Sequence, residues 1–203
     1  MVQRLVLVRH GETLHNVDGI AQGWSDSELS DRGRVQVAAV GERLAGFGAT
    51  SLYCSSLPRA ITTADAIARA LGLEPRIVEG LKEMNCGEWE GRAFLDVRKE
   101  QADFYRRWIS DPTLACPGGE SYADVRERLL ASFEQIVREG GERPVIVSHG
   151  TAIRIAATAL LDLSLESARQ FAQDNAAINM FERRSNRYIL LRWNDTSHVN
   201  GEF

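Results

Sequence analysis

Short apolar runs alternate with longer amphipathic segments along most of the 203 residues, and few folds accommodate this pattern. Runs rich in valine, leucine and isoleucine are typical of buried strands, while apolar side chains three and four positions apart are typical of helices. We expect strands in the runs RLVLV (4–8), SLYC (51–54), PRIVEG (75–80) and RPVIVSHG (143–150). Strands alternating with helices predict an α/β fold: a three-layer sandwich with a mostly parallel central sheet and helices on both faces.

Helix and turn signals lie between these runs. Ser30 is a typical N-cap, Pro58 falls in the first turn of the next helical segment, and the sequence from Ser121 resembles a capping box. A fourth helical segment follows the run RPVIVSHG (143–150). Residues 176–194 alternate apolar and polar side chains, which predicts a hairpin that turns at Ser185–Asn186.

Residues 84–125 interrupt the alternation. They hold a broken helical segment over 93–110 and a loop, DPTLACPGGES (111–121), that is marked by two prolines and two glycines. We expect a single domain over residues 1–203, in which residues 84–125 form a helical insert over one end of the sheet.

Arginine, histidine and glutamate side chains follow four of the expected strands. Arg9 and His10 follow the first strand, Arg59 lies just beyond the second, Glu83 follows the third and His149 follows the fourth. The carboxyl ends of parallel strands meet at one edge, where ligands of such sheets bind. Helices that begin at this edge add free N–H groups and the positive ends of their dipoles.

Two arginines and two histidines at helix N-termini predict an anion site. The arginine fork matches the oxygen atoms of a phosphate group. A metal site is disfavoured, because a fixed positive charge beside a histidine ligand repels a cation and because metal sites normally use more carboxylates. We therefore expect no metal and no cofactor.

A histidine in a phosphate pocket can act as a nucleophile. Its neutral nitrogen can attack phosphorus and form a phosphohistidine, while arginines stabilise the charge on the oxygen atoms. The leaving alkoxide then needs a proton. Glu83 is the expected acid, and a partly buried glutamate can later act as the base for water. Glu12 and Glu88 are the alternatives.

The composition limits the classes of partner. The net charge of -4 and the pI of about 5.6 argue against a general nucleic-acid or membrane-surface binder. Three cysteines without a CxxC pair favour reduced thiols and a cytoplasmic protein. The longest apolar runs are too short to span a bilayer. We expect a small-molecule phosphate ester as the partner, with no nucleic acid and no membrane; a homodimer stays open.

Five segments together resemble the histidine phosphatase superfamily, which contains the cofactor-dependent phosphoglycerate mutases and related phosphatases. In the order of that family they are LVRHGET (7–13), SSLPRAITTA (55–64), LKEMNCGEWEG (81–91), GGES (118–121) and VSHGTAIR (147–154). The resemblance covers nearly the whole chain. The first and last segments in this order are highly specific, whereas RHG alone is not.

The resemblance implies a role for each residue of the anion site. His10 would be the nucleophile and Glu83 the proton donor. Arg9, Arg59 and His149 would bind the phosphoryl group, and the insert would cover this active site.

The resemblance also points to weaker candidates. Asn16 would reach the same phosphate from the first loop. Gln22 and Gly23 match a loop that approaches the substrate. Gly150 would let a backbone N–H approach the phosphate, and Thr151 beside it is a further candidate for substrate contact.

The segment from Glu83 to Gly91 resembles the phosphatase branch of the family, with its pattern E-x-x-x-G-x-W-E-G. The chain is also shorter than typical mutases. We therefore expect a metal-independent phosphomonoesterase that hydrolyses a small soluble phosphate ester through a phosphohistidine; a phosphoglycerate mutase is the alternative. Cys86 departs from the family pattern, in which a bulkier side chain is common, so the leaving group stays open. A phosphate-sensing scaffold is disfavoured, because every chemical role is filled.

Other conspicuous side chains have simpler interpretations. His15 is expected to be structural. His198 lies in a C-terminal tail that could fold back over the pocket. The aromatic residues of the insert are expected to form its core, with one or two on the pocket wall: Trp89, Phe94, Phe104, Tyr105 and Trp108.

Overall fold

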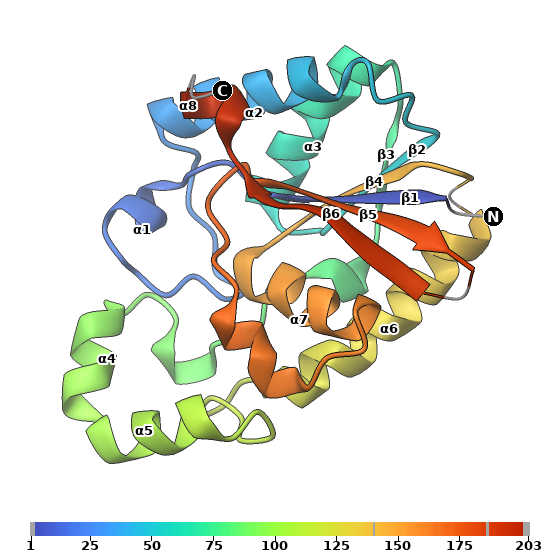
Figure 1. Ribbon diagram of the computed structural model, residues 1–203. Coiled ribbons are helices and arrows are strands. Elements are labelled where there is room, and N and C mark those ends of the chain that lie inside the picture. The colour runs from blue at the N-terminus through green and yellow to red at the C-terminus, as the bar shows by residue number, and fades with distance from the viewer. Residues whose placement is uncertain (1–2, 140, 186, 201–203) are drawn as a thin grey trace.

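A six-stranded sheet forms the centre of the protein (Figure 1). The computed structural model describes residues 3–139, 141–185 and 187–200. The strand order is β3-β2-β4-β1-β5-β6, in which β1 to β4 are parallel and β5 and β6 are antiparallel. The strands are β1 (Arg4–Arg9), β2 (Ser51–Cys54), β3 (Pro75–Ile77), β4 (Pro144–Ser148), β5 (Ile178–Arg184) and β6 (Arg187–Asp195). The prediction of a mostly parallel sheet is confirmed.

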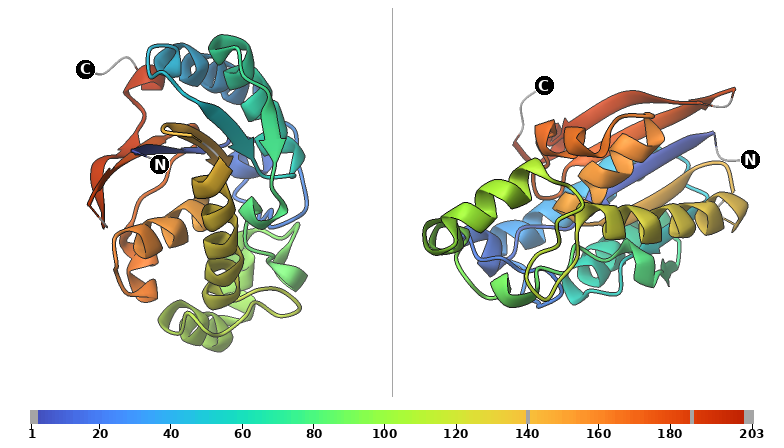
Figure 2. Two further views of the ribbon diagram at one scale, coloured as in Figure 1. Left: turned by 90° about the vertical axis from the view of Figure 1, so that its right-hand side faces the viewer. Right: turned by 90° about the horizontal axis from the view of Figure 1, so that it is seen from below.

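Helices cover both faces of the sheet (Figure 2). On one face lie α2 (Asp31–Leu44) and α3 (Pro58–Leu71), and on the other lie α6 (Tyr122–Glu139) and α7 (Gly150–Leu160). Successive side chains of a strand point to opposite faces. Val6 and Val8 of β1 accordingly pack in the apolar cluster beneath α2 and α3, whereas Leu5 and Leu7 pack in the apolar cluster beneath α6 and α7. This arrangement is the expected three-layer sandwich.

Local signals set where the helices begin. The Ser30 hydroxyl accepts a hydrogen bond from the Gly33 N–H at 3.0 Å and caps α2. Ser121 and Asp124 form the expected capping box: the Asp124 N–H donates to the Ser121 hydroxyl, and the Ser121 N–H donates to the Asp124 carboxylate. Pro58 is the first residue of α3, which places Arg59 in the first turn of that helix.

The expected hairpin is formed by β5 and β6. Of its predicted turn, Ser185 adopts a positive φ of 56°, and Asn186 lies outside the described residues. The short helices outside the insert are α1 (Leu14–Val17), η1 (Glu79–Leu81), η3 (Leu165–Gln170) and α8 (Ser197–Asn200). No helix in the described part of the chain is long and apolar enough to cross a membrane.

The insert comprises the 3-10 helix η2 (Gly87–Trp89), α4 (Phe94–Glu100) and α5 (Ala102–Ser110). Its core is aromatic: the buried Trp89 ring meets Phe104 and Trp108 edge to face, with ring centroids 6.0 and 5.1 Å apart. The last four residues of the segment 84–125 differ from the rest, because α6 begins at Tyr122. Residues 122–125 thus form the first turn of α6, and the bounds 84–125 of the insert stay a prediction.

Candidate active site

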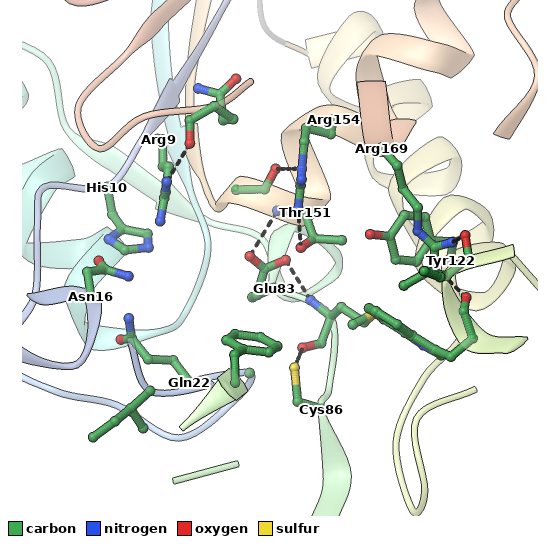
Figure 3. Close-up of a pocket in the computed structure, with 18 of the residues that line it drawn as sticks. Arg9, His10, Asn16, Gln22, Glu83, Cys86, Tyr122, Thr151, Arg154 and Arg169 are labelled. Atoms are coloured by element: carbon green, nitrogen blue, oxygen red, sulfur yellow. Dashed lines mark hydrogen bonds between the residues drawn. The ribbon is translucent and has the colours of Figure 1, made fainter. Parts of the chain in front are cut away.

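A cavity of about 420 Å³ lies at the carboxyl edge of the parallel strands, between the sheet and the insert (Figure 3). Side chains from β1, α3, the segment after β3, the insert and the N-terminus of α7 line it. It brings together nine of the ten predicted site residues: Arg9, His10, Asn16, Gln22, Gly23, Arg59, Glu83, Gly150 and Thr151. His149 is absent from the cavity wall, and its ring packs against that of His10.

The His10 ring is held in one orientation. Its side chain is buried, and Nδ1 lies 2.8 Å from the carbonyl oxygen of Gly11, which can only accept. Nδ1 therefore carries the proton, and Nε2 keeps its lone pair. Burial, followed by the charges of Arg59 and Arg9, lowers the pKa of His10 well below its ordinary value of 6.5. The ring is neutral at physiological pH, which is the form that a nucleophile needs.

The His149 ring packs against His10, with ring centroids 5.1 Å apart. Its Nε2 lies 2.8 Å from the hydroxyl oxygen of Ser55. Burial, followed by the charge of Arg59, also lowers the pKa of His149 well below 6.5. Two neutral imidazoles therefore lie side by side, since a proton on either would be buried next to two guanidinium groups.

Three buried nitrogens near His10 have no hydrogen-bond partner. Among the described residues, Nε of Arg9, Nε of Arg59 and Nδ1 of His149 are buried and have no hydrogen-bond partner. Burial lowers the pKa of Arg9 to about 10, so its guanidinium remains charged at neutral pH. Unpaired buried donors are costly in folded proteins. An oxyanion bound beside His10 would supply acceptors for the Nε–H groups of Arg9 and Arg59.

Arg59 also fastens the loop that follows α1. Its Nη2 donates to the Gly23 carbonyl at 2.7 Å, and its Nη1 donates to the Asp26 carboxylate at 2.8 Å. Glu90 supports the same loop by accepting the N–H groups of Trp24 and Ser25 at 2.8 and 2.9 Å. Sequence reasoning placed Arg59 on the phosphate alone. The structure adds that its charge positions the loop carrying Gln22 and Gly23.

Glu83 is the only carboxylate among the described residues that line the cavity. It accepts three backbone N–H groups: Oε1 from Met84 at 2.9 Å and from Ala152 at 3.1 Å, and Oε2 from Thr151 at 3.0 Å. Two of these belong to the first turn of α7, so the carboxylate is fixed at a helix N-terminus (Figure 3).

The two alternative carboxylates lie elsewhere. Glu12 accepts from the Ser30 hydroxyl at 2.7 Å and pairs with Arg32, and it is outside the cavity wall. Glu88 is exposed and is also outside it. Of the three candidate carboxylates, only Glu83 lines the cavity.

Asn16 and Gln22 are positioned through Thr13, which sequence reasoning missed. The Thr13 N–H donates to Oδ1 of Asn16 at 3.2 Å, and Nε2 of Gln22 donates to the Thr13 hydroxyl at 2.8 Å. Asn175 also donates to Oδ1 of Asn16, at 2.9 Å. With its oxygen engaged, the Asn16 amide offers Nδ2 as the donor for the cavity.

The structure adds two arginines that were not predicted. Arg154 follows Gly150 by four residues, so it lies on the same face of α7, and this spacing was the available signal. Arg169 comes from η3, an irregular segment with no such signal. With Arg9, Arg59 and Glu83, they place four guanidinium groups and one carboxyl group on the described cavity wall, although the chain carries a net charge of -4.

The remaining histidines lie outside the cavity wall. Nε2 of His198 lies 3.1 Å from the Ala176 carbonyl oxygen, and α8 packs against α2; residues 201–203 of the tail lie outside the described residues. Phe94, Tyr105 and Trp108 line the cavity, where one or two aromatic residues were expected. Within the described residues, no three His, Cys, Asp or Glu side chains gather in a group that could hold a metal ion.

The chain matches proteins of known families over almost its full length. Residues 5–196 match the model of the histidine phosphatase superfamily, branch 1. The sequence is 33% identical to phosphoserine phosphatase 1 of Hydrogenobacter thermophilus over 202 residues, which cover 98% of this chain and 95% of that protein. It is 32% identical to a probable phosphoglycerate mutase of Salmonella paratyphi C over 205 residues, which cover 97% and 95%.

The fold matches a solved structure equally well. The structure of a mycobacterial glucosyl-3-phosphoglycerate phosphatase in complex with VO3 superposes with a TM-score of 0.89 at 32% identity, covering 95% of this chain and 99% of that one. Sequence, fold and the arrangement around His10 agree, and the chain belongs to the histidine phosphatase superfamily, branch 1.

Proposed function

We propose that the protein is a metal-independent phosphomonoesterase that hydrolyses a small soluble phosphate ester through a phosphohistidine at His10. The observation that carries the proposal is the neutral His10 ring, which is fixed through Nδ1 by the Gly11 carbonyl and flanked by Arg9 and Arg59. A neutral imidazole beside two guanidinium groups can attack a phosphorus atom whose oxygens those groups hold.

The first step transfers the phosphoryl group. Nε2 of His10 forms a bond to phosphorus while the ester P–O bond breaks in line with it. Arg9 and Arg59 stabilise the charge on the phosphoryl oxygens. Protonated Glu83 gives its proton to the leaving alkoxide, so that an alcohol departs and a carboxylate remains.

The second step returns the enzyme to its starting state. The Glu83 carboxylate takes a proton from water as the water oxygen attacks phosphorus. The P–N bond to His10 breaks, inorganic phosphate leaves, and Glu83 is again protonated for the next cycle. The three backbone N–H groups around Glu83 match the carboxylate form that this step uses.

Phosphatase and mutase share the first step and differ in access of water. A mutase must keep the intermediate in a closed pocket, whereas a phosphatase must admit water. Two side chains on the cavity wall, Phe94 and Ile109, are 42% and 44% exposed, and Cys86 contributes only a small thiol. These observations favour hydrolysis.

The test is a phosphoenzyme trap combined with product analysis. A phosphomonoester labelled with ³²P should leave acid-labile label on the wild-type protein, and none on His10→Ala, which should retain less than a few per cent of the activity. His15→Ala is the matched control, because His15 lies outside the cavity wall. Interconversion of 3- and 2-phosphoglycerate without phosphate release would replace the phosphatase by the mutase. Label retained on His10→Ala would refute the role of His10.

A further inference from the structure

Asn175 lies in the loop between η3 and β5, outside the wall of the cavity that contains His10. Its side chain nevertheless contacts two residues of that wall. Nδ2 of Asn175 donates to Oδ1 of Asn16 at 2.9 Å and to the His10 carbonyl oxygen at 3.3 Å. The proposed reaction gives Asn175 no task, although it meets the backbone of the proposed nucleophile and a side chain expected to bind the phosphate.

The contact with Asn175 decides which way the Asn16 amide faces. Oδ1 of Asn16 accepts from the Asn175 amide at 2.9 Å, from the Thr13 hydroxyl at 3.1 Å and from the Thr13 N–H at 3.2 Å. An amide whose oxygen is surrounded by donors presents its NH₂ group on the other side. Figure 3 shows the Asn16 and His10 side chains reaching into the same part of the cavity. Nδ2 of Asn16 is therefore the end that is left to an anion bound beside His10.

Asn175 is itself held in one orientation. The His10 carbonyl oxygen can only accept, so it requires the NH₂ group of Asn175 on this side, and the same group reaches Asn16. The donors from Thr13 orient Asn16 less strictly, because the hydroxyl can also accept and because 3.2 Å is at the long end of N–H···O distances. Asn175 is therefore the main group that orients the Asn16 amide.

The loop that carries Asn175 is fastened to the hairpin of β5 and β6. Oδ1 of Asn194 accepts from the Asp174 N–H at 2.7 Å, and Nδ2 of Asn194 donates to the Asp174 carboxylate at 2.8 Å. The Asn194 N–H donates to Oδ1 of the buried Asn179 at 2.9 Å, and Nδ2 of Asn179 donates to the Leu7 carbonyl at 3.1 Å. Polar networks of this kind are rigid when their members are satisfied. The sheet therefore sets the position of Asn175.

Backbone hydrogen bonds fix the same loop against the end of β1. The Ala176 N–H donates to the His10 carbonyl oxygen at 3.1 Å, and the Arg9 N–H donates to the Ala177 carbonyl oxygen at 3.2 Å. These bonds continue the pairing of β1 with β5 as far as His10. The distance from Asn175 to the two residues that it contacts is thus set by main-chain geometry and not by a free side chain.

We infer that Asn175 is a positioning residue for phosphoryl transfer, which holds Oδ1 of Asn16 so that Nδ2 of Asn16 donates to an oxygen of the phosphoryl group beside His10; this inference rests on the proposed function. Without the Asn175 amide, Asn16 can turn its oxygen toward the anion. An attractive contact with the phosphate is then replaced by a repulsive one. Asn194 acts one step further away, through the loop that carries Asn175.

The test is a double-mutant cycle on the dissociation constant of inorganic phosphate, measured by calorimetry without turnover. Asn16→Ala and Asn175→Ala should each weaken phosphate binding by about 10- to 100-fold, as for a hydrogen bond to a charged group. In the Asn16→Ala background, Asn175→Ala should change the dissociation constant by less than about threefold, because both substitutions remove the same contact. Losses that multiply in the double variant would overturn the inference, and so would an unchanged affinity in Asn175→Ala.

Two further variants separate positioning from a general loss of structure. Asn194→Gly removes the amide that holds Asp174 and tolerates the φ of 53° at this position, so it should weaken phosphate binding by a smaller factor, and not in the Asn16→Ala background. It carries the cycle if Asn175→Ala does not fold. Ser197→Ala is the matched control: it removes a hydrogen bond of 2.7 Å to Asp195 at the end of the same hairpin and should keep the wild-type affinity. An equal loss in Ser197→Ala would overturn the inference.

A spectroscopic measurement reports the orientation of the amide directly. In protein labelled with ¹⁵N at asparagine, the side-chain signals of Asn16 are identified by their absence in Asn16→Ala. They should form one sharp pair in the wild-type protein and should broaden or double in Asn175→Ala, because both amide orientations become populated. One unchanged sharp pair in Asn175→Ala would overturn the inference. Hydrolysis of no ester by the wild-type protein would refute the proposed function instead, while the cycle on phosphate binding would still decide the role of Asn175.

Discussion

The rings of His10 and His149 lie with their centroids 5.1 Å apart at an interplanar angle of 56°, and both are neutral. Neither could accept a proton without placing a buried cation beside Arg9 and Arg59, which explains why the pKa of each histidine is low. The two histidines are therefore uncharged imidazoles beside permanently charged guanidinium groups, which is the state that the proposed function needs.

The first prediction concerns stability against pH. The unfolded chain binds protons at these histidines near pH 6.5, and the folded protein binds them only at lower pH, so stability is full above about 6.5 and is lost as the pH falls below it. Each histidine should contribute a slope of up to about 1.4 kcal/mol per pH unit. Urea unfolding between pH 5 and 8 measures this slope. His10→Asn and His149→Asn should each flatten it, and an unchanged slope in both variants would contradict the assignment.

The second prediction concerns Glu83. Glu83→Gln keeps the size of the side chain and removes the transferable proton, so activity on alkyl phosphates should fall by about 10²- to 10⁴-fold. The loss should be smaller for p-nitrophenyl phosphate, because its phenolate leaves without a proton. Glu12→Gln is the control, since Glu12 lies outside the cavity wall, and it should keep most of the activity on both substrates. Equal losses on the two substrates in Glu83→Gln would move the acid role to another group.

The third prediction concerns metals. Activity should survive dialysis against EDTA, because the arginines beside His10 supply the positive charge that a metal would otherwise provide. Vanadate should inhibit the protein, since it adopts the five-coordinate geometry of an in-line displacement. The measurement is phosphate release before and after dialysis. Loss of activity that a divalent ion restores would favour a metal-dependent hydrolase.

The fourth prediction concerns the loop fastened by Arg59. Gly23 has a φ of 53°, and a Cβ at this position would lie 2.1 Å from Oε1 of Glu90 and 2.8 Å from the Cys86 nitrogen. Gly23→Ala should therefore destabilise the protein by about 1–3 kcal/mol and weaken phosphate binding. Gly19→Ala is the control, because Gly19 has a φ of 67° and open space around it. Denaturation and phosphate titration of both variants measure the difference. Equal effects of the two substitutions would show that backbone strain alone explains the loss.

The residues at the strand ends could be predicted from the sequence because topology alone places them. Once Arg9, His10 and His149 follow parallel strands, they must meet at one edge of the sheet. The sequence also predicted Arg59, but not that its guanidinium holds the loop Gly23–Asp26, since this contact joins segments 33 to 36 residues apart with no periodic signal between them.

The part of the cavity wall that carries Arg169 was the least predictable. Arg169 reaches the cavity from an irregular turn, and its position depends on how the Trp108 and Tyr122 rings pack. Such packing depends on how the shapes of the side chains fit together in three dimensions, and the spacing of residues along the sequence does not reveal it. Gly87 shows the same limit: no sequence signal indicates that its backbone lies in close contact with the loop from Pro117 to Gly119.

The position of Glu83 at the start of α7 has a spectroscopic consequence. The N–H groups of Thr151 and Ala152 donate directly to its carboxylate, so their ¹H and ¹⁵N chemical shifts depend on the charge of that group. A proton arriving on Glu83 would weaken both hydrogen bonds and expose the two amides to faster exchange with solvent. These two backbone amides are therefore a built-in probe that reports, without any label in the cavity, whether the acid or the base form of the enzyme is present.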